Sequence, residues 1–248
     1  MDRFKNSTLK SIVTDDYRAA AVFEKFSLDF CCGGGITIDQ ACSEKMLDPA
    51  LVYAELGELE NISNGNTPRF SAWLLDELVD YIVNVHHRYV REAIPVLAAH
   101  TQKVAMVHGE RHPEVVTIAR HFEAVARDMT AHMMKEEHVL FPYIKNLVTA
   151  KRNGRPFQLP PFGGAYNPIR MMETEHQAAG DEMSAVRDLT NNYVLPDDAC
   201  TTYRVTFQEL QQFEEDLHRH VHLENNILFP KTIVLEEELM SSLRAVNG

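Results

Sequence analysis

The sequence predicts an all-α protein, in which a small helical N-terminal domain precedes an up-and-down four-helix bundle. Two observations lead to this prediction. Long amphipathic stretches follow one another from residue 71 onward, and no segment alternates apolar and polar residues over a useful length. The 248 residues, 45% of them hydrophobic and 24% charged, can form one large domain and a small appendage.

The first 60 residues read as three short helices, within DDYRAAAVFEKF, TIDQACSEK and DPALVYAELGEL. Thr37 and Asp48 are suitable N-caps for the second and the third. The break between the first two is FCCGGG, where the vicinal thiols Cys31 and Cys32 precede three glycines that end a helix.

The polar, turn-forming segment Ser63–Arg69 (SNGNTPR) predicts a boundary between domains. Residues 1–62 would form the N-terminal domain and residues 71–248 the bundle. Four helical stretches are expected in the bundle: Ser71 to about Thr101, Pro113 to about Ala150, roughly Pro168–Leu189, and about Pro196 towards the C-terminus. Four consecutive helices pack most simply up and down.

Charge and hydropathy exclude several partners. A net charge of −12 argues against nucleic acid and against anionic membrane surfaces, because a phosphate backbone requires clustered Lys and Arg. No apolar run approaches the roughly 20 residues that span a bilayer. The first residues, MDRFKNSTLKSIVTDD, contain no secretory apolar segment, so a cytoplasmic location is expected. The oligomeric state is left open between a monomer and a homodimer.

An internal repeat predicts the chemistry. Asp128–Pro142 and Asp216–Pro230 share the pattern D-x3-H-x3-E-x4-F-P, with matching residues 88 positions apart. A spacing of four residues puts the Asp, His and Glu of each copy on one helical face. A single H-x3-E is usually a surface ion pair, but two copies with shared flanks favour a metal site.

Each repeat follows a helix with a histidine of its own. His87 lies 45 residues before His132, and His176 lies 44 before His220. Two such hairpins would bring six ligands into the bundle core: His87, His132, Glu136, His176, His220 and Glu224.

Imidazole and carboxylate suit two non-haem iron ions, and the absence of thiolate from this set argues against a structural zinc–thiolate site. The two glutamates could bridge the ions, leaving two histidines for each and room for an oxo bridge or a small ligand. Asp128 and Asp216, one turn before the repeat histidines, are expected to accept imidazole N–H bonds or to shuttle protons.

Other histidines are weaker candidates. His86 points about 100° away from His87, so only one of the two can face the core squarely, and the other is expected at the bundle surface. His218 and His222 flank His220 in the same way and are expected in solvent or at the rim. His108 and His112 are expected in loop capping rather than in metal binding.

Several longer motifs carry a resemblance. The bundle resembles hemerythrin-like domains, and nearly the whole chain is similar to the iron–sulfur cluster repair di-iron proteins, also called repair of iron centres proteins. The motifs are DFCCGGG (Asp29–Gly35), VHGERHPE (Val107–Glu114), HMMKEE (His132–Glu137), METEH (Met172–His176) and HLENNILFP (His222–Pro230).

The resemblance implies the six ligands above, with bridging Glu136 and Glu224, and its register at REAIP (Arg91–Pro95) selects His87 over His86. It implies that Glu175, beside a ligand, acts as an outer carboxylate, although a solvated glutamate is the plainer interpretation. The implied function is repair of iron–sulfur clusters damaged by nitric oxide or oxidants, by supply of iron. Damaged iron–sulfur proteins would then be the partners, and NO or O2 the small ligands.

The cysteines and the bundle leave alternatives open. Cys31 and Cys32 are either incidental thiols at a helix end or a relay that takes up iron, reacts with NO or docks a partner. The two ions could instead reduce NO to nitrous oxide, which would make the protein an enzyme, or the bundle could store or sense O2 or NO. The N-terminal cysteine domain argues against simple O2 storage, which does not need it.

Overall fold

A computed structural model describes residues 4–61, 68–154 and 159–247. Within these ranges the regular elements are helical, apart from one isolated bridge between Thr8 and Thr37. The all-α prediction is confirmed. None of the described helices is both long and apolar enough to cross a membrane.

The N-terminal part consists of four short helices: α1 (Leu9–Asp15), α2 (Ala19–Lys25), α3 (Ile38–Glu44) and α4 (Pro49–Asn61). Thr8 is the N-cap of α1, and its hydroxyl accepts a hydrogen bond from the Ser11 amide. Thr37 and Gln40 form a reciprocal capping box at the start of α3, as the sequence predicts for a Thr N-cap. The predicted linker, Ser63–Arg69, falls largely outside the described residues, at 62–67.

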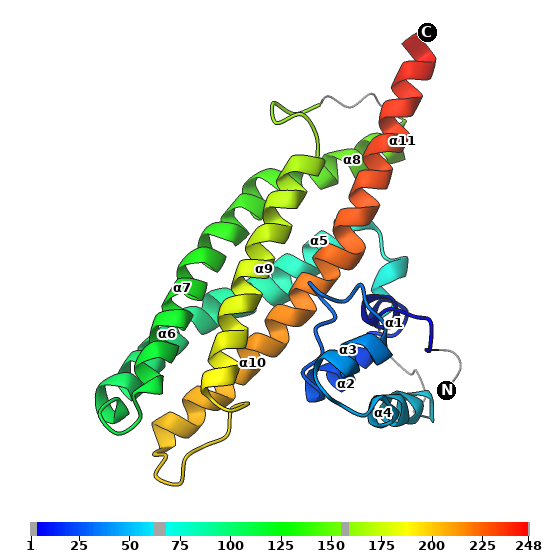
Figure 1. Ribbon diagram of the computed structural model, residues 1–248. Coiled ribbons are helices and arrows are strands. Elements are labelled where there is room, and N and C mark those ends of the chain that lie inside the picture. The colour runs from blue at the N-terminus through cyan, green and yellow to red at the C-terminus, as the bar shows by residue number, and fades with distance from the viewer. Residues whose placement is uncertain (1–3, 62–67, 155–158, 248) are drawn as a thin grey trace.

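The described remainder of the chain forms a bundle of four long helices that run side by side (Figure 1). The first joins α5 (Leu75–Ile82), η2 (Val83–His87) and α6 (Arg88–His108) after the short turn η1 (Phe70–Ala72). The second joins α7 (Glu114–Lys135), η3 (Glu136–Leu140) and α8 (Phe141–Asn153). The third is α9 (Tyr166–Leu189), and the fourth joins α10 (Thr201–Leu223), η4 (Glu224–Leu228) and α11 (Phe229–Asn247). The four-helix bundle prediction is confirmed.

Three turns inside these helices are π-helical. They are η2, η3 and η4, and they coincide with candidate ligands: η2 ends at His87, while η3 and η4 begin at Glu136 and Glu224. A π turn holds one extra residue, which rotates the following side chains relative to an uninterrupted helix, and such turns are frequent at functional sites.

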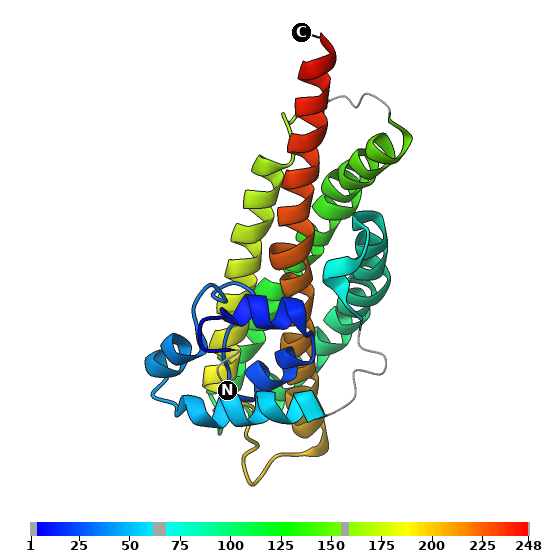
Figure 2. The same ribbon diagram turned by 90° about the vertical axis from the view of Figure 1, so that its right-hand side faces the viewer.

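The N-terminal helices pack against α10, on one side of the bundle (Figures 1 and 2). Phe30 from the N-terminal part and Phe213 from α10 belong to one buried apolar cluster. A second cluster, which includes Phe141 and Phe229, fills the other end of the bundle. On the second bundle helix Met129 belongs to the first cluster and Leu140 to the second, so the polar residues between them lie where the two clusters meet.

Candidate metal centre

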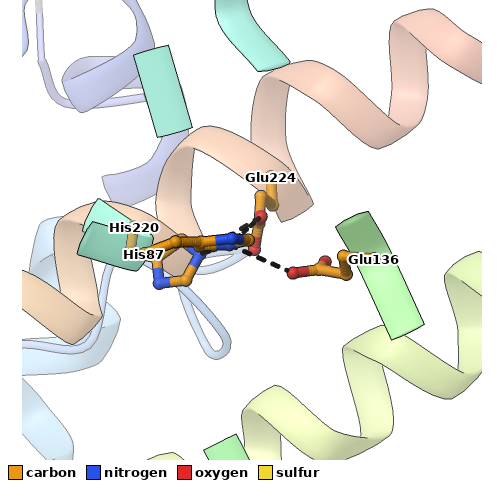
Figure 3. Close-up of side chains that lie close together, drawn as sticks. All are labelled: His87, Glu136, His220 and Glu224. Atoms are coloured by element: carbon orange, nitrogen blue, oxygen red, sulfur yellow. Dashed lines mark hydrogen bonds and ion pairs between the residues drawn. The ribbon is translucent and has the colours of Figure 1, made fainter. Parts of the chain in front are cut away.

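Six polar side chains are buried where the apolar clusters meet. Each is at most 1% exposed, and every long helix of the bundle contributes at least one. This His–Glu cluster consists of His87, His132, Glu136, His176, His220 and Glu224, the six predicted ligands. Figure 3 shows how His87 and His220 converge on the two carboxylates, with dashed lines from their ring nitrogens to Glu136 and Glu224.

The cluster divides into two groups that share both carboxylates. One contains His87 and His220, and the other contains His132 and His176; Glu136 and Glu224 belong to both. In each group the candidate ligand atoms all lie within 4.8 Å of one another. Two ions placed in these groups would therefore be neighbours with shared carboxylate ligands.

Facing ring nitrogens show that His132 and His176 fit a cation. Nδ1 of His132 lies 2.9 Å from Glu175 Oε2, and Nδ1 of His176 lies 2.8 Å from Asn225 Oδ1. Both Nδ1 atoms are therefore assigned as donors, which leaves a lone pair on each Nε2 of the neutral rings. These Nε2 atoms are 2.9 Å apart, a separation at which either a shared proton or a metal cation must lie between them.

The other pair repeats the arrangement. Nδ1 of His87 lies 2.6 Å from Glu137 Oε1, and its Nε2 lies 3.1 Å from Nε2 of His220. Two imidazole nitrogens at right angles, each about 2.1 Å from one metal ion, are about 3.0 Å apart. Both observed separations match this value.

The buried carboxylates also require positive charge. The four carboxylate oxygens of Glu136 and Glu224 are buried without a hydrogen-bond partner. Burial raises the pKa of Glu224, but the facing His220 and His176 overcome it and hold that pKa well below its usual range. Burial likewise opposes a charge on His132, yet Glu136 raises its pKa to about 9. The donor set therefore fits cations.

The outer hydrogen-bond partners differ from those expected. Asp128 is 60% exposed and pairs with Arg127, so it does not accept the N–H of His132, which goes to Glu175 on the neighbouring helix. Asp216 pairs with His86 at 2.9 Å rather than with His220. Four-residue spacing along one helix could not show that Asp128 is exposed, nor that the Nδ1 atoms of His87, His132 and His176 each bond to a residue of another helix.

Glu175, the sequence neighbour of His176, contacts His132 on another helix, at 2.9 Å from Nδ1, and it also pairs with Lys135. Burial would raise the pKa of Glu175, but the hydrogen bonds from Lys135 and His132 lower it, so it is an ionised acceptor. Glu137 and Asn225 were missed. The repeat itself could have identified them, because each directly follows the glutamate of its repeat copy.

Three other histidines are less exposed than predicted. His86 is 3% exposed instead of lying at the surface, because Asp216 and Tyr81 surround it within the protein. His222 is buried, and His218 is partly covered. Phe30 of the N-terminal part packs edge-on against both rings, and burial lowers the pKa of each to about 4.

The vicinal thiols lie at the seam between the N-terminal part and the bundle. Cys31 Sγ is 3.7 Å from Cys32 Sγ, and Asp29 Oδ1 accepts from both backbone amides. The hydrogen bond to Cys32, followed by burial, raises the pKa of Cys31. Both cysteines line a cavity of about 210 Å³ together with side chains of α9 and α10, among them Arg187, Glu214 and His218.

One turn of η4 touches both regions. Glu224 belongs to the His–Glu cluster and Asn225 holds the ring of His176. The next residue, Asn226, donates from Nδ2 to the backbone carbonyls of Phe30 and Cys31, each at 3.3 Å.

Comparison with protein families gives two matches. Residues 78–232 match the hemerythrin HHE cation binding domain. Residues 5–60 match ScdA_N, a domain of unknown function. The first match contains all six residues of the His–Glu cluster, and the second contains both vicinal cysteines.

Several curated proteins are similar to nearly the whole chain. A probable iron–sulfur cluster repair protein of Haemophilus influenzae is 32% identical, over 93% of this chain and 98% of the relative. The iron–sulfur cluster repair protein YtfE of Musicola paradisiaca is 34% identical, over 93% and 97%. The protein of the same name from Escherichia coli O8 is 31% identical, over 94% and 99%.

Proposed function

Because this chain belongs to the hemerythrin HHE family, and within it to the iron–sulfur cluster repair proteins, we propose that it repairs clusters damaged by nitric oxide or oxidants. It does so in the cytoplasm by supplying iron from a di-iron site in the bundle. The observation that supports this most strongly is the arrangement of facing imidazole nitrogens over two shared carboxylates that are buried without a hydrogen-bond partner.

The six residues have distinct roles in this proposal. His132 and His176 hold one ion, and His87 and His220 hold the other. Glu136 and Glu224, which belong to both groups, would be ligands of both ions and would offset their charge. Imidazole and carboxylate suit iron, and two iron ions held there would supply exchangeable metal and could bind a small ligand.

The test is metal content. Protein purified without oxygen should contain about two iron ions per chain, by elemental analysis and Mössbauer spectroscopy, because the cluster offers two groups of ligands. One stably bound zinc per chain, with no iron uptake on reconstitution, would show that the proposed cofactor is wrong.

Delivery of iron to another protein also needs a surface outside the buried cluster. We propose that the cavity lined by Cys31 and Cys32 serves as this docking or relay site for a damaged iron–sulfur protein. Thiolates are iron ligands, but two adjacent cysteines cannot supply the four thiolates that a cluster usually takes, so the client's own cysteines would complete the site.

Reduction of NO to nitrous oxide is the second candidate function. The adjacency of the two ligand groups favours it, because two NO molecules could then bind side by side. Steady nitrous oxide production by the reduced protein, with an electron donor present and no damaged client, would favour this enzyme over the iron donor. A protein that binds NO or O2 reversibly without turnover would instead be a store or a sensor.

A further inference from the structure

The two halves of the metal centre follow the internal repeat. Upstream histidines correspond to each other, and so do the repeat histidines, glutamates and phenylalanines. In the first half, His87 donates from Nδ1 to Glu137 and its ring stacks on Phe141, with centroids 5.6 Å apart and planes at 18°. The first half therefore fixes its upstream histidine by one hydrogen bond and one stacked ring.

The second half repeats this arrangement at equivalent positions. His176 donates from Nδ1 to Asn225, and its ring stacks on Phe229 at 6.0 Å and 2°. Asn225 and Phe229 are each 88 positions after their counterparts, Glu137 and Phe141. For the upstream histidines the two halves match closely.

The repeat histidines break this symmetry. Nδ1 of His132 is bonded to Glu175, the residue directly before His176. The equivalent residue for His220 is the one directly before His87, and that residue is His86 rather than a carboxylate.

His86 does not take the place of the missing acceptor. Its own Nδ1 is bonded to Asp216 at 2.9 Å, and its ring lies parallel to that of His220, with centroids 5.6 Å apart and planes at 6°. Nδ1 of His220 is buried without a hydrogen-bond partner. The ring of His220 is therefore stacked on His86, but its Nδ1 has no hydrogen-bond partner.

A carboxylate or carbonyl that accepts the second N–H of a ligand imidazole fixes the ring and raises its basicity. Loss of such a partner typically lowers metal affinity by roughly 10–100-fold. The pair His132 and His176 has two acceptors, whereas the pair His87 and His220 has one. Both pairs share the same bridging carboxylates, so this difference is not offset there.

We propose that the two metal positions are unequal, and that the ion held by His87 and His220 leaves first. This inference rests on the proposed di-iron site. The iron ion beside His86 would exchange, and the iron ion beside Glu175 would be retained. After the first ion has left, Glu136 and Glu224 would still be ligands of the second, whose charge would offset their mutual repulsion.

The experiment follows iron release from full-length protein loaded with two ferrous ions, mixed anaerobically with excess chromogenic ferrous chelator. Wild type should release one equivalent in a fast phase and one in a slow phase. Glu175→Ala removes the acceptor of His132, so it should accelerate the slow phase by roughly 10–100-fold. Glu137→Ala removes the acceptor of His87, so it should accelerate the fast phase and leave the slow one unchanged.

The two variants are matched, because each removes one carboxylate that accepts from one ligand imidazole, and circular dichroism checks that each remains folded. A single release phase for both equivalents in wild type would overturn the inference. So would the reverse pattern, in which Glu137→Ala accelerates the slow phase. Fewer than two ions in the loaded wild type would instead contradict the di-iron proposal.

Discussion

His86 and His87 are sequence neighbours with different partners, and their substitution tests the ligand assignment. His87→Ala removes a proposed ligand and should lower the iron content to about one ion per chain. His86→Ala should keep both ions but lower the thermal midpoint, because it leaves a cavity and the largely buried Asp216 without its partner. A stranded buried polar group costs on the order of 1–3 kcal/mol.

Elemental analysis and thermal unfolding of the two variants provide the measurements. Asp128→Ala is the control: this side chain is exposed and pairs with Arg127, so the substitution should change neither quantity. Loss of iron in His86→Ala together with retention in His87→Ala would show that the register is reversed.

Residue by residue, the sequence predicted the buried cluster but not its surroundings. The repeat was informative because His-x3-Glu fixes two side chains on one face of one helix. The acceptor of each imidazole N–H depends on how neighbouring helices pack, which no spacing along one helix reveals. Asp128 therefore proved to be a surface residue, whereas Glu137 and Asn225, one position beyond the pattern, hold the upstream histidines.

At the scale of elements, the contact between α2 and α10 predicts a pH dependence. Glu24 accepts from Arg219 through Oε2, while its Oε1 is buried without a hydrogen-bond partner. Burial, partly opposed by Arg219, raises the pKa of Glu24 from 4.5 to about 7. The folded state thus holds this proton more tightly than the unfolded state, so stability falls as pH rises from about 4.5 to 7 and stays lower above that range.

Glu24→Gln removes this ionisation and should be more stable than wild type at pH 8. One pKa unit corresponds to about 1.4 kcal/mol, so the gain should be at most roughly 3 kcal/mol, and it should vanish near pH 4. Urea unfolding across this pH range measures it, with Glu55→Gln, an exposed partner of Lys25, as the control. Equal stabilities at pH 8 would show that Glu24 is not penalised by burial.

The long helices were predictable because their apolar spacing is regular, and the π turns were not. A π turn shifts the hydrogen-bond register without changing composition, so the expected helices ran straight through residues 83–87, 136–140 and 224–228. In hindsight the Phe-Pro pair that directly follows η3 and η4 marks two of them. The same helix-by-helix reasoning misjudged His218 and His222, which another part of the chain covers.

For the whole molecule, the division of labour between the thiols and the bundle is testable. Changing Cys31 and Cys32 together to Ser should preserve two ions per chain, since neither belongs to the His–Glu cluster. Repair of a damaged cluster enzyme should slow by about tenfold or more, because a serine hydroxyl cannot replace the soft sulfur of a thiol as an iron ligand. Alkylation of these thiols should have the same effect.

Cys200→Ser is the matched control, because this thiol is exposed and does not line the cavity. Undiminished repair by the double variant would exclude the thiols from the mechanism and would favour storage or sensing. Deletion of residues 1–62 is a less selective test than the sequence suggested. Phe30 and Phe213 share one apolar cluster, so the deletion should also destabilise the bundle.

The π turn η4 contacts both the His–Glu cluster and the loop that holds Cys31 and Cys32. Glu224 is one of the two shared carboxylates, and Asn225 bonds to the ring of His176. Asn226 donates to the backbone carbonyls of the cysteine loop. Thermodynamic reciprocity applies to any such linkage. If a client bound at the loop lowers the affinity for iron by some factor, then the iron-free chain must bind that client more tightly by the same factor. Only reloading with iron would then favour release of the client.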